Sequence, residues 1–333
     1  MTISKVINHY GKIQSPYMGI LVNHLPMGQL ALYKIRPDIK GVKKYSQIYS
    51  QKHKVDPVKT QYTKINSLEE CLGNRNLYES CLDIVKAKIQ EEGIDNVINY
   101  VLNTYPLGIS SGLFHTTIRL AYGVEGYRLE KELVDEVARA LAYYITAYRE
   151  AKVFTRKIDS EDFINEIIKF KNKPYIKKIL DEEDSLGQRL RRFYNNKEYL
   201  EEGFVIDGTE EEKIRSLLNL LIPVYYDSRN IVILHCITGL HGIIVLKNYF
   251  NNFHDVLDIL TTCIITHLKA IDNLKYGEKI SDHTELSWDC IKTKASEVSD
   301  IHAIKLTYTS YELDKLYNIP ELKDIALKRI KHK

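Results

Sequence analysis

Five of the eleven histidines in this sequence lie inside apolar segments, where a polar ring is unusual. A buried imidazole must find a hydrogen-bond partner or bind a cation, and imidazole is a common ligand for metal ions. Because the five rings come from well-separated segments, the sequence predicts that most of them meet at one metal ion. These histidines are His24, His115, His235, His241 and His302.

One of these histidines has an unexpected neighbour, because Lys305 follows His302 by three residues. Residues three apart on a helix lie on the same face, and helix bundles use a Glu-x-x-His pair at this spacing to hold metals. A protonated lysine has no acceptor, but burial beside a cation favours the neutral amine. The neutral amine can add carbon dioxide to form an anionic, carboxylate-like carbamate. We therefore include Lys305 among the candidate ligands.

His235 and His241 compete for one place in such a site. Six residues along a regular helix leave the two rings about 120° apart. One is therefore predicted to be a ligand, and the other to support the site or face the substrate. The sequence leaves open which histidine has which role.

Two further side chains near His115 are candidates for contact with a substrate. Arg119 lies one turn after His115 on the same face, and a buried arginine needs an anionic partner. Glu125 or a substrate oxygen is predicted to provide it. Tyr122, three residues further on, is the second candidate, because its side chain can stack or donate a hydrogen bond.

A plainer interpretation fits each histidine taken alone, namely a core ring bonded to a backbone carbonyl. That interpretation weakens for the set, since it has to hold five times. The other histidines lie at polar borders or near the termini and are given no role; they are His9, His53, His254, His267, His283 and His332.

The elements that position these residues are predicted to be helices. Apolar residues recur with the helical period along most of the chain, and no segment shows the sustained alternation of a strand. The sequence therefore predicts an all-α fold, a single-domain bundle of two helical layers around a buried, histidine-lined cavity. Helices are predicted over 66–91, 111–124, 128–150, 160–171, 174–196, 209–221, 229–248, 254–273, 284–298, 300–316 and 320–331.

Two irregular regions interrupt the helical pattern. Residues 34–65 are polar, basic and broken by Pro37 and Pro57, which predicts a surface loop with one short helix around 43–52. Residues 197–208 contain two glycines and are predicted to connect the two halves of one domain spanning 1–333.

The composition argues against several classes of protein. A net charge of +3 over 333 residues is too small to indicate binding to nucleic acid or to an anionic membrane. The most apolar stretch, 231–246, contains two histidines and is shorter than the ~18–20 apolar residues of a membrane span. The five cysteines form no CxxC pair and the N-terminus lacks a signal sequence, which predicts a cytoplasmic protein.

Four sequence blocks, in order, resemble the questin oxidase-like family, and the resemblance covers roughly residues 20–310. The helix containing Ala140-Leu-Ala-Tyr143 resembles the one that follows the second block in that family. The blocks are His24-Leu-Pro-Met27 followed by Ala31-Leu32; His115-Thr-Thr-Ile-Arg-Leu-Ala-Tyr-Gly-Val-Glu125; His235-Cys-Ile-Thr-Gly-Leu-His241; and Asp300-Ile-His-Ala-Ile-Lys-Leu306.

The resemblance implies an all-helical oxidoreductase that uses molecular oxygen on aromatic polyketides such as anthraquinones. Some members of the family resemble non-haem iron dioxygenases that cleave a quinone ring, with the metal held by histidines and a carboxylated lysine. Carried over to this chain, the iron(II) ligands would be His24, His115, one of His235 and His241, His302 and carboxylated Lys305.

Two alternatives keep the helical fold and change the chemistry. In the first, the protein is a metal-free, NADPH-dependent monooxygenase of Baeyer–Villiger type, in which the histidines act on protons and on the substrate. In the second, it is a non-catalytic helical protein that binds an aromatic ligand. The intact histidine blocks argue against the second alternative, because a non-catalytic protein would have no need to keep a set of buried polar rings.

Overall fold

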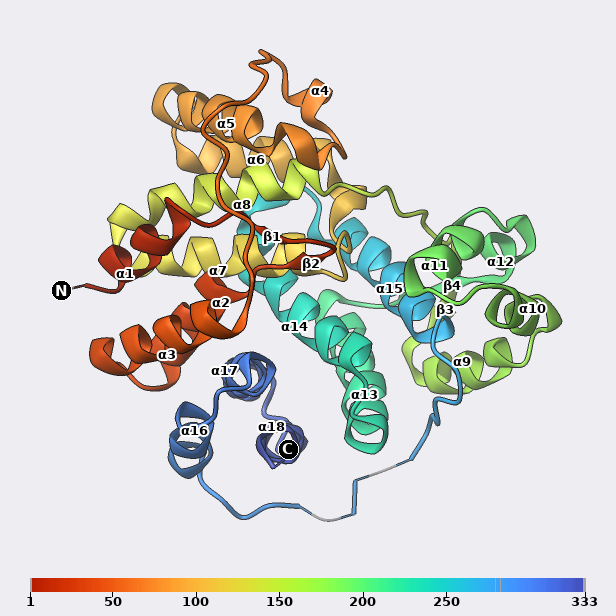
Figure 1. Cartoon of the computed structure of the whole chain (residues 1–333). Coiled ribbons are helices and arrows are strands. Elements are labelled where there is room, and N and C mark those ends of the chain that lie inside the picture. Colours follow the sequence, from red (N-terminus) through yellow and green to blue (C-terminus); the bar gives the residue numbers. More distant parts are fainter. Residues whose placement is uncertain (1, 279, 282, 332–333) are drawn as a thin grey trace.

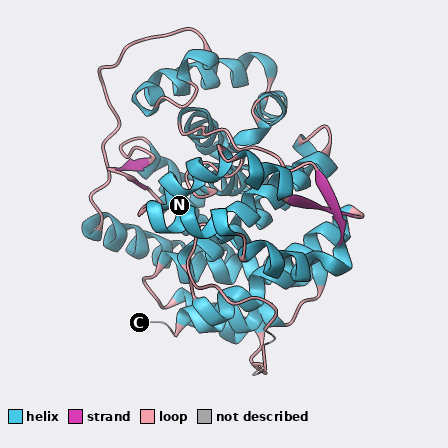
Figure 2. Ribbon diagram, turned by 90° about the vertical axis from the view of Figure 1, so that its right-hand side faces the viewer, coloured by secondary structure: helices cyan, strands magenta, loops and turns pink. Residues whose placement is uncertain are grey.

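The computed structural model describes residues 2–278, 280–281 and 283–331, and most of these residues are helical (Figure 1). The predicted all-α fold class is confirmed, and the short strands stand out against the helices in Figure 2. The α-helices of the described part are α1 (Ile3–Gly11), α2 (Leu25–Ile35), α3 (Ile39–Lys52), α4 (Leu68–Cys71), α5 (Tyr78–Glu92), α6 (Ile94–Thr104), α7 (His115–Leu129), α8 (Val134–Thr146), α9 (Phe163–Lys171), α10 (Pro174–Glu182), α11 (Leu186–Tyr194), α12 (Lys197–Glu202), α13 (Glu210–Ser228), α14 (Ile231–Val245), α15 (Phe253–Lys269), α16 (Trp288–Ser296), α17 (Ile301–Tyr317) and α18 (Glu321–Ile330).

The central helices are α7 and α14, which pack against each other (Figure 1). Helix α7 also packs on α8 and α2, whereas α14 packs on α13, α15 and α17. Helix α17 closes the group by packing on α2 and α18. Four helices that are distant in sequence therefore surround a common interior: α2, α7, α14 and α17.

Two glycines of α14 permit its close contact with α7. A Cβ atom at Gly239 would lie 2.6 Å from Cγ of Phe114, and one at Gly242 would lie 3.3 Å from Cγ2 of Thr117. The apolar side chains around these positions bury both helices almost completely. The absence of side chains at these two positions therefore lets α7 lie directly against the backbone of α14.

Side-chain caps fix where several of these helices begin. Asn230 accepts a hydrogen bond from the Val232 amide at the start of α14, and Asp300 accepts one from the His302 amide at the start of α17. Such caps satisfy amides that have no partner within the helix. The cap at Asp300 also fixes the position of His302 in the first turn.

The basic segment 34–65 is less irregular than the sequence predicts. Helix α2 runs to Ile35, and α3 covers fourteen residues from Ile39 to Lys52. Asp38 caps the start of α3. Val42 and Tyr49 are buried on its inner face. The lysines that give the segment its polar character occupy the other face. The short helix predicted around 43–52 is therefore confirmed, but it begins earlier, at Ile39, and residues 34–35 belong to α2 rather than to a loop.

The predictions of no sheet and of an irregular connection over 197–208 were also wrong. Strands β1 (Tyr17–Met18) and β2 (Leu21–Val22) form an antiparallel pair, whereas β3 (Arg156–Asp159) and β4 (Phe204–Asp207) pair in parallel. Residues 197–208 therefore contain α12 and β4. Strands of two to four residues are too short to produce a detectable alternation.

Other differences concern helix boundaries. The predicted helix 66–91 is divided into α4 and α5, and 174–196 is divided into α10 and α11, where Ser185 caps the second helix. Helices α1 and α6 were not predicted. No helix of the described residues has both the length and the apolar character needed to cross a membrane.

Candidate metal centre

Four histidine rings form a closed circuit between α2, α7, α14 and α17. The ring centroids are 4.5 Å apart for His24 and His115, and 4.4 Å apart for His115 and His235. The circuit continues from His235 to His302 at 5.2 Å and returns from His302 to His24 at 5.0 Å. We call these four residues the histidine ring. Four of the five histidines singled out in the sequence are thus brought together.

Backbone carbonyls orient three members of the histidine ring. Nδ1 of His24 lies 2.6 Å from the carbonyl oxygen of Val22, and Nδ1 of His235 lies 2.7 Å from that of Ile231. Nδ1 of His115 contacts the carbonyl of Gly112. A carbonyl only accepts hydrogen bonds, so each Nδ1 carries the proton and each Nε2 has a free lone pair.

The Nε2 atoms of His24 and His115 are 2.7 Å apart. Two lone pairs at this distance repel each other unless a cation or a proton lies with them. Two nitrogen ligands at right angles on one metal ion, each about 2.1 Å away, would be ~3 Å apart. The pair therefore fits two adjacent positions on one ion.

The remaining members of the histidine ring offer further donor atoms. One nitrogen each from His24, His235 and His302 lies within 4.8 Å of the other two. Nε2 of His235 is buried without a hydrogen-bond partner. A buried acceptor without a partner is unfavourable in an empty core and is explained by a bound ligand.

The electrostatic environment keeps these rings neutral. Burial, followed by the neighbouring charges of His115 and Lys305, holds the pKa of His24 well below its usual range. Burial also lowers the pKa of His115 to about 3 and that of His235 far below normal. Neutral imidazole is the form that binds metal, so protons do not compete for these nitrogens near neutral pH.

Lys305 is fully buried beside the histidine ring, one turn after His302 on α17. Its Nζ has no hydrogen-bond partner, and burial lowers its pKa to about 7. A substantial fraction of this amine is therefore unprotonated at neutral pH. An unprotonated, unpartnered amine is the species that reacts with carbon dioxide.

Asp300 connects His302 to a second charged residue. Its Oδ1 lies 3.6 Å from Nδ1 of His302, and its Oδ2 lies 2.8 Å from Nη2 of Arg329. Burial alone would raise the pKa of Asp300, but the hydrogen bonds from His302 and the charge of Arg329 hold it at about 2. A carboxylate behind a histidine in this way orients the ring for metal binding.

A strained turn positions His115. Gly112, Leu113 and Phe114 all have positive φ, at 58°, 59° and 63°. For the two residues with side chains this conformation costs about 1–3 kcal/mol each. The turn places His115 at the first position of α7 and brings the Gly112 carbonyl to its Nδ1.

The histidine ring is open to solvent on one side. His115 and His235 are buried, whereas His24 is half-buried and the His302 side chain is 21% exposed. Both partly exposed residues lie at helix starts, on α2 and α17. The most exposed edge of the ring is therefore the one formed by these two residues.

His241 lies apart from the histidine ring. Its ring centroid is 5.8 Å from that of Tyr308, and its Nδ1 is 3.5 Å from Oγ1 of Thr309. The Tyr308 hydroxyl donates to Glu125. The two histidines of α14 thus face different surroundings, as their angular separation predicts, and His235 is the one beside the other candidate ligands.

Arg119 has a partner that the sequence did not predict. Its Nη2 lies 2.9 Å from Oε1 of Glu136, and Nε of Arg139 lies 2.7 Å from the other oxygen of the same carboxylate. Glu125, the partner expected from the sequence, hydrogen-bonds to Tyr308 instead. The prediction of Glu125 was wrong because α8, rather than α7 itself, supplies the carboxylate.

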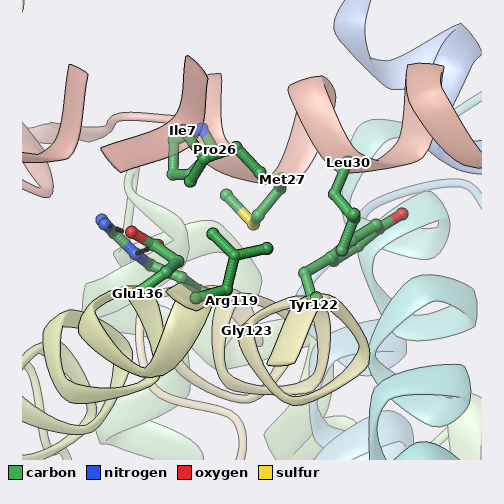
Figure 3. Close-up of a pocket in the computed structure, with 10 residues that line it drawn as sticks. Ile7, Pro26, Met27, Leu30, Arg119, Tyr122, Gly123 and Glu136 are labelled. Atoms are coloured by element: carbon green, nitrogen blue, oxygen red, sulfur yellow. Dashed lines mark hydrogen bonds and ion pairs between the residues drawn. The ribbon is translucent and has the colours of Figure 1, made fainter. Parts of the chain in front are cut away.

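Arg119 and Tyr122 both line a small void beside α2. Figure 3 shows their polar ends pointing away from each other, with Met27 between them. The void has about 10 Å³, which is room for roughly one water. Nη1 of Arg119 and the Tyr122 hydroxyl have no hydrogen-bond partner.

His267 was assigned to a polar border in the sequence, which was wrong. It is 1% exposed on α15, its Nδ1 lies 2.7 Å from the Cys263 carbonyl, and its Nε2 has no partner. The apolar residues on both sides of it, from Leu257 to Leu268, could have revealed its burial. His332 lies outside the described residues.

Comparison with known protein families matches residues 21–310 to the Questin oxidase-like family. The match spans most of the chain and includes the whole histidine ring and Lys305, so the chain belongs to this family. Membership indicates an oxidoreductase that acts on aromatic polyketides. A search among curated proteins finds no match.

Proposed function

We propose that this protein is an oxygen-dependent oxidoreductase in which the histidine ring and Lys305 hold one iron(II) ion beside a quinone-like aromatic substrate. The main supporting observation is the 2.7 Å separation of the Nε2 atoms of His24 and His115, both of which present lone pairs. Imidazole nitrogen suits iron, and one anionic oxygen ligand would balance part of its charge.

The residues present are suited to such an ion. His24, His115, His235 and His302 would each donate one nitrogen. Lys305 would contribute as a carbamate, formed when its neutral amine attacks carbon dioxide and releases one proton. When bound, iron would supply the one-electron chemistry by which dioxygen reacts with an aromatic ring.

The protein's own part is to hold and orient. Carbonyls fix the tautomers of His24, His115 and His235, so that these rings need not reorient during turnover, and Asp300 lies behind His302. The buried side of the ring keeps out water, whereas the edge at His24 and His302 gives access to substrate. Arg119 and Tyr122 are proposed to donate hydrogen bonds to two separate oxygens of the substrate, after displacement of Met27.

Elemental analysis of protein purified without chelator tests the metal site. We expect close to one equivalent of iron after anaerobic loading. Less than about a tenth of an equivalent of any transition metal would overturn the proposal, as would NADPH-dependent oxygen uptake by iron-free protein. The second result would favour the metal-free monooxygenase.

Two substitutions at Lys305 test the carbamate. Lys305→Ala should lose most of the bound iron, whereas Lys305→Glu should retain part of it, because glutamate supplies a similar anionic oxygen. Protein equilibrated with ¹³C-labelled bicarbonate should show a carbamate carbon signal by NMR that is missing in Lys305→Ala. Equal iron contents in the two variants, with no labelled signal in the parent, would exclude a carbamate ligand.

A further inference from the structure

A second candidate site lies behind the turn that positions His115. Helices α11 and α15, the turn at residues 110–113 and the segment 149–150 enclose a cavity of about 460 Å³. This volume is within the usual range for small-molecule sites of about 300–1,000 Å³. The cavity is lined by none of the four histidines of the ring, so the proposed iron site does not account for it.

The inner end of the cavity carries an unused hydrogen-bond acceptor. His267 lines it and is almost completely buried. Its Nδ1 donates to the Cys263 carbonyl 2.7 Å away, so Nε2 is left with a lone pair and has no partner. An unpaired acceptor in a buried position is favourable only when a ligand supplies a donor.

The walls and the mouth of the cavity differ in character. Leu186, Leu190 and Tyr194 give it apolar and aromatic walls. The exposed residues Arg149 and Arg191 lie at its mouth, where no ion pair involving either guanidinium is seen among the described residues. Nη1 of Arg149 donates to the carbonyls of Gly73 and Tyr148, and Nε of Arg191 donates to that of Gly187, which leaves the other N–H groups for a ligand. The one acid there, Glu150, is already paired with Lys152 at 2.9 Å. The mouth is therefore positively charged.

We infer that this cavity binds a hydroxylated aromatic acid. The hydroxyl would donate to Nε2 of His267, the flat ring would lie between Leu186, Leu190 and Tyr194, and the carboxylate would meet Arg149 and Arg191. This inference goes beyond the proposed oxidation, because binding here requires neither iron nor oxygen.

Binding of two naphthoates to metal-free, full-length protein tests the inference. The probes are 6-hydroxy-2-naphthoate, which carries a hydroxyl opposite its carboxylate, and 2-naphthoate, which lacks the hydroxyl. Calorimetry should show the hydroxylated probe binding about tenfold more tightly. In His267→Phe this difference should vanish, and in His267→Gln, which restores an acceptor, part of it should return.

The arginines are tested in the same assay. Arg191→Ala should weaken both probes by about three- to tenfold and reduce the salt dependence of binding. Arg192→Ala is the matched control, because Arg192 is paired with Glu182 and does not line the cavity. It should leave both affinities unchanged.

A substitution that fills the cavity gives a second test, which does not depend on the folding of the His267 variants. Leu190→Trp should abolish binding of both probes while iron content stays at the parent level. The inference fails if neither probe binds below about 1 mM, if His267→Phe preserves the preference for the hydroxyl, or if Leu190→Trp binds normally. Loss of iron binding elsewhere in the chain would not change these results.

Discussion

Three histidines of the ring are fixed at Nδ1 by a hydrogen bond to an oxygen atom, and the fourth, His302, has a carboxylate oxygen 3.6 Å from its Nδ1. Val22, Gly112 and Ile231 provide carbonyls, and Asp300 provides a carboxylate. With Nδ1 occupied, the rings of His24, His115 and His235 have only Nε2 to offer to a ligand. The arrangement specifies which nitrogen binds before any ion arrives.

The two histidines of α14 allow a sharp test at the scale of single residues. His235→Ala should strongly lower the amount of bound iron, because it removes one nitrogen donor from the ring. We expect iron affinity to fall by about 10–100-fold or more. His241→Ala should keep close to the parent iron content, since His241 contacts Tyr308 and Thr309 instead. Elemental analysis and a competitive chelator titration would measure both.

His241→Ala is the matched control in this comparison, because both rings are buried on the same helix and both truncations leave a similar cavity. Melting temperatures of the two metal-free variants should therefore fall by similar amounts. Equal loss of iron in both variants would contradict the assignment of His235 to the ring.

The sequence identified the ring residues but not all of their partners. The histidines and Lys305 were recognisable because polar side chains within apolar segments need an explanation. The choice between His235 and His241 depends on which face of α14 meets α17. The pairing of Glu136 with Arg119 depends on how α8 packs against α7. Such choices are made by tertiary packing and leave no local signal.

At the scale of elements, the contact between α7 and α14 is what brings His115 near His235. Phe114, at the end of the strained turn, packs directly on the backbone of α14 at Gly239. A side chain at residue 239 would push this turn outward and move His115 with it. Gly239 therefore influences the position of His115 through Phe114, although it does not contact the histidine ring itself.

Gly239→Ala tests this coupling. The added Cβ would lie 2.6–2.8 Å from Cγ, Cδ1 and Cβ of Phe114, and overpacking of this kind costs about 1–3 kcal/mol. We expect a lower unfolding free energy and weaker iron binding, measured by denaturant titration and chelator competition. Gly187→Ala in α11 is the control, because a Cβ there meets nothing within 4 Å; it should preserve both properties.

The helical pattern of the sequence was sufficient for most long helices, including α14 and α17. It succeeded only in part for α3, which begins four residues before the predicted helix at 43–52, because lysines on the outer face hide buried positions such as Val42. It failed for β3 and β4, which are four residues long and pair across a distance of almost fifty residues. Periodicity detects an element that has a long apolar face, and these elements lack one.

At the scale of the whole molecule, the buried histidines make stability depend on pH. Burial lowers the pKa of His267 and that of His241 to about 4, whereas an exposed histidine in the unfolded chain has a pKa of about 6.5. Between these values the unfolded chain binds more protons than the folded one. The stability that these two neutral rings contribute is therefore fully present above about pH 6.5, and it decreases as the pH falls towards 4.

His267 allows this dependence to be measured for a single group, because it lies outside the histidine ring. The parent protein should lose up to about 3 kcal/mol relative to His267→Gln as the pH falls from 6.5 to 4, since only the parent must keep this ring neutral. Denaturant unfolding of both metal-free proteins across this range would give the difference directly. A difference that stays constant with pH would show that His267 takes up a proton as readily in the folded protein as in the unfolded chain, so that burial does not lower its pKa.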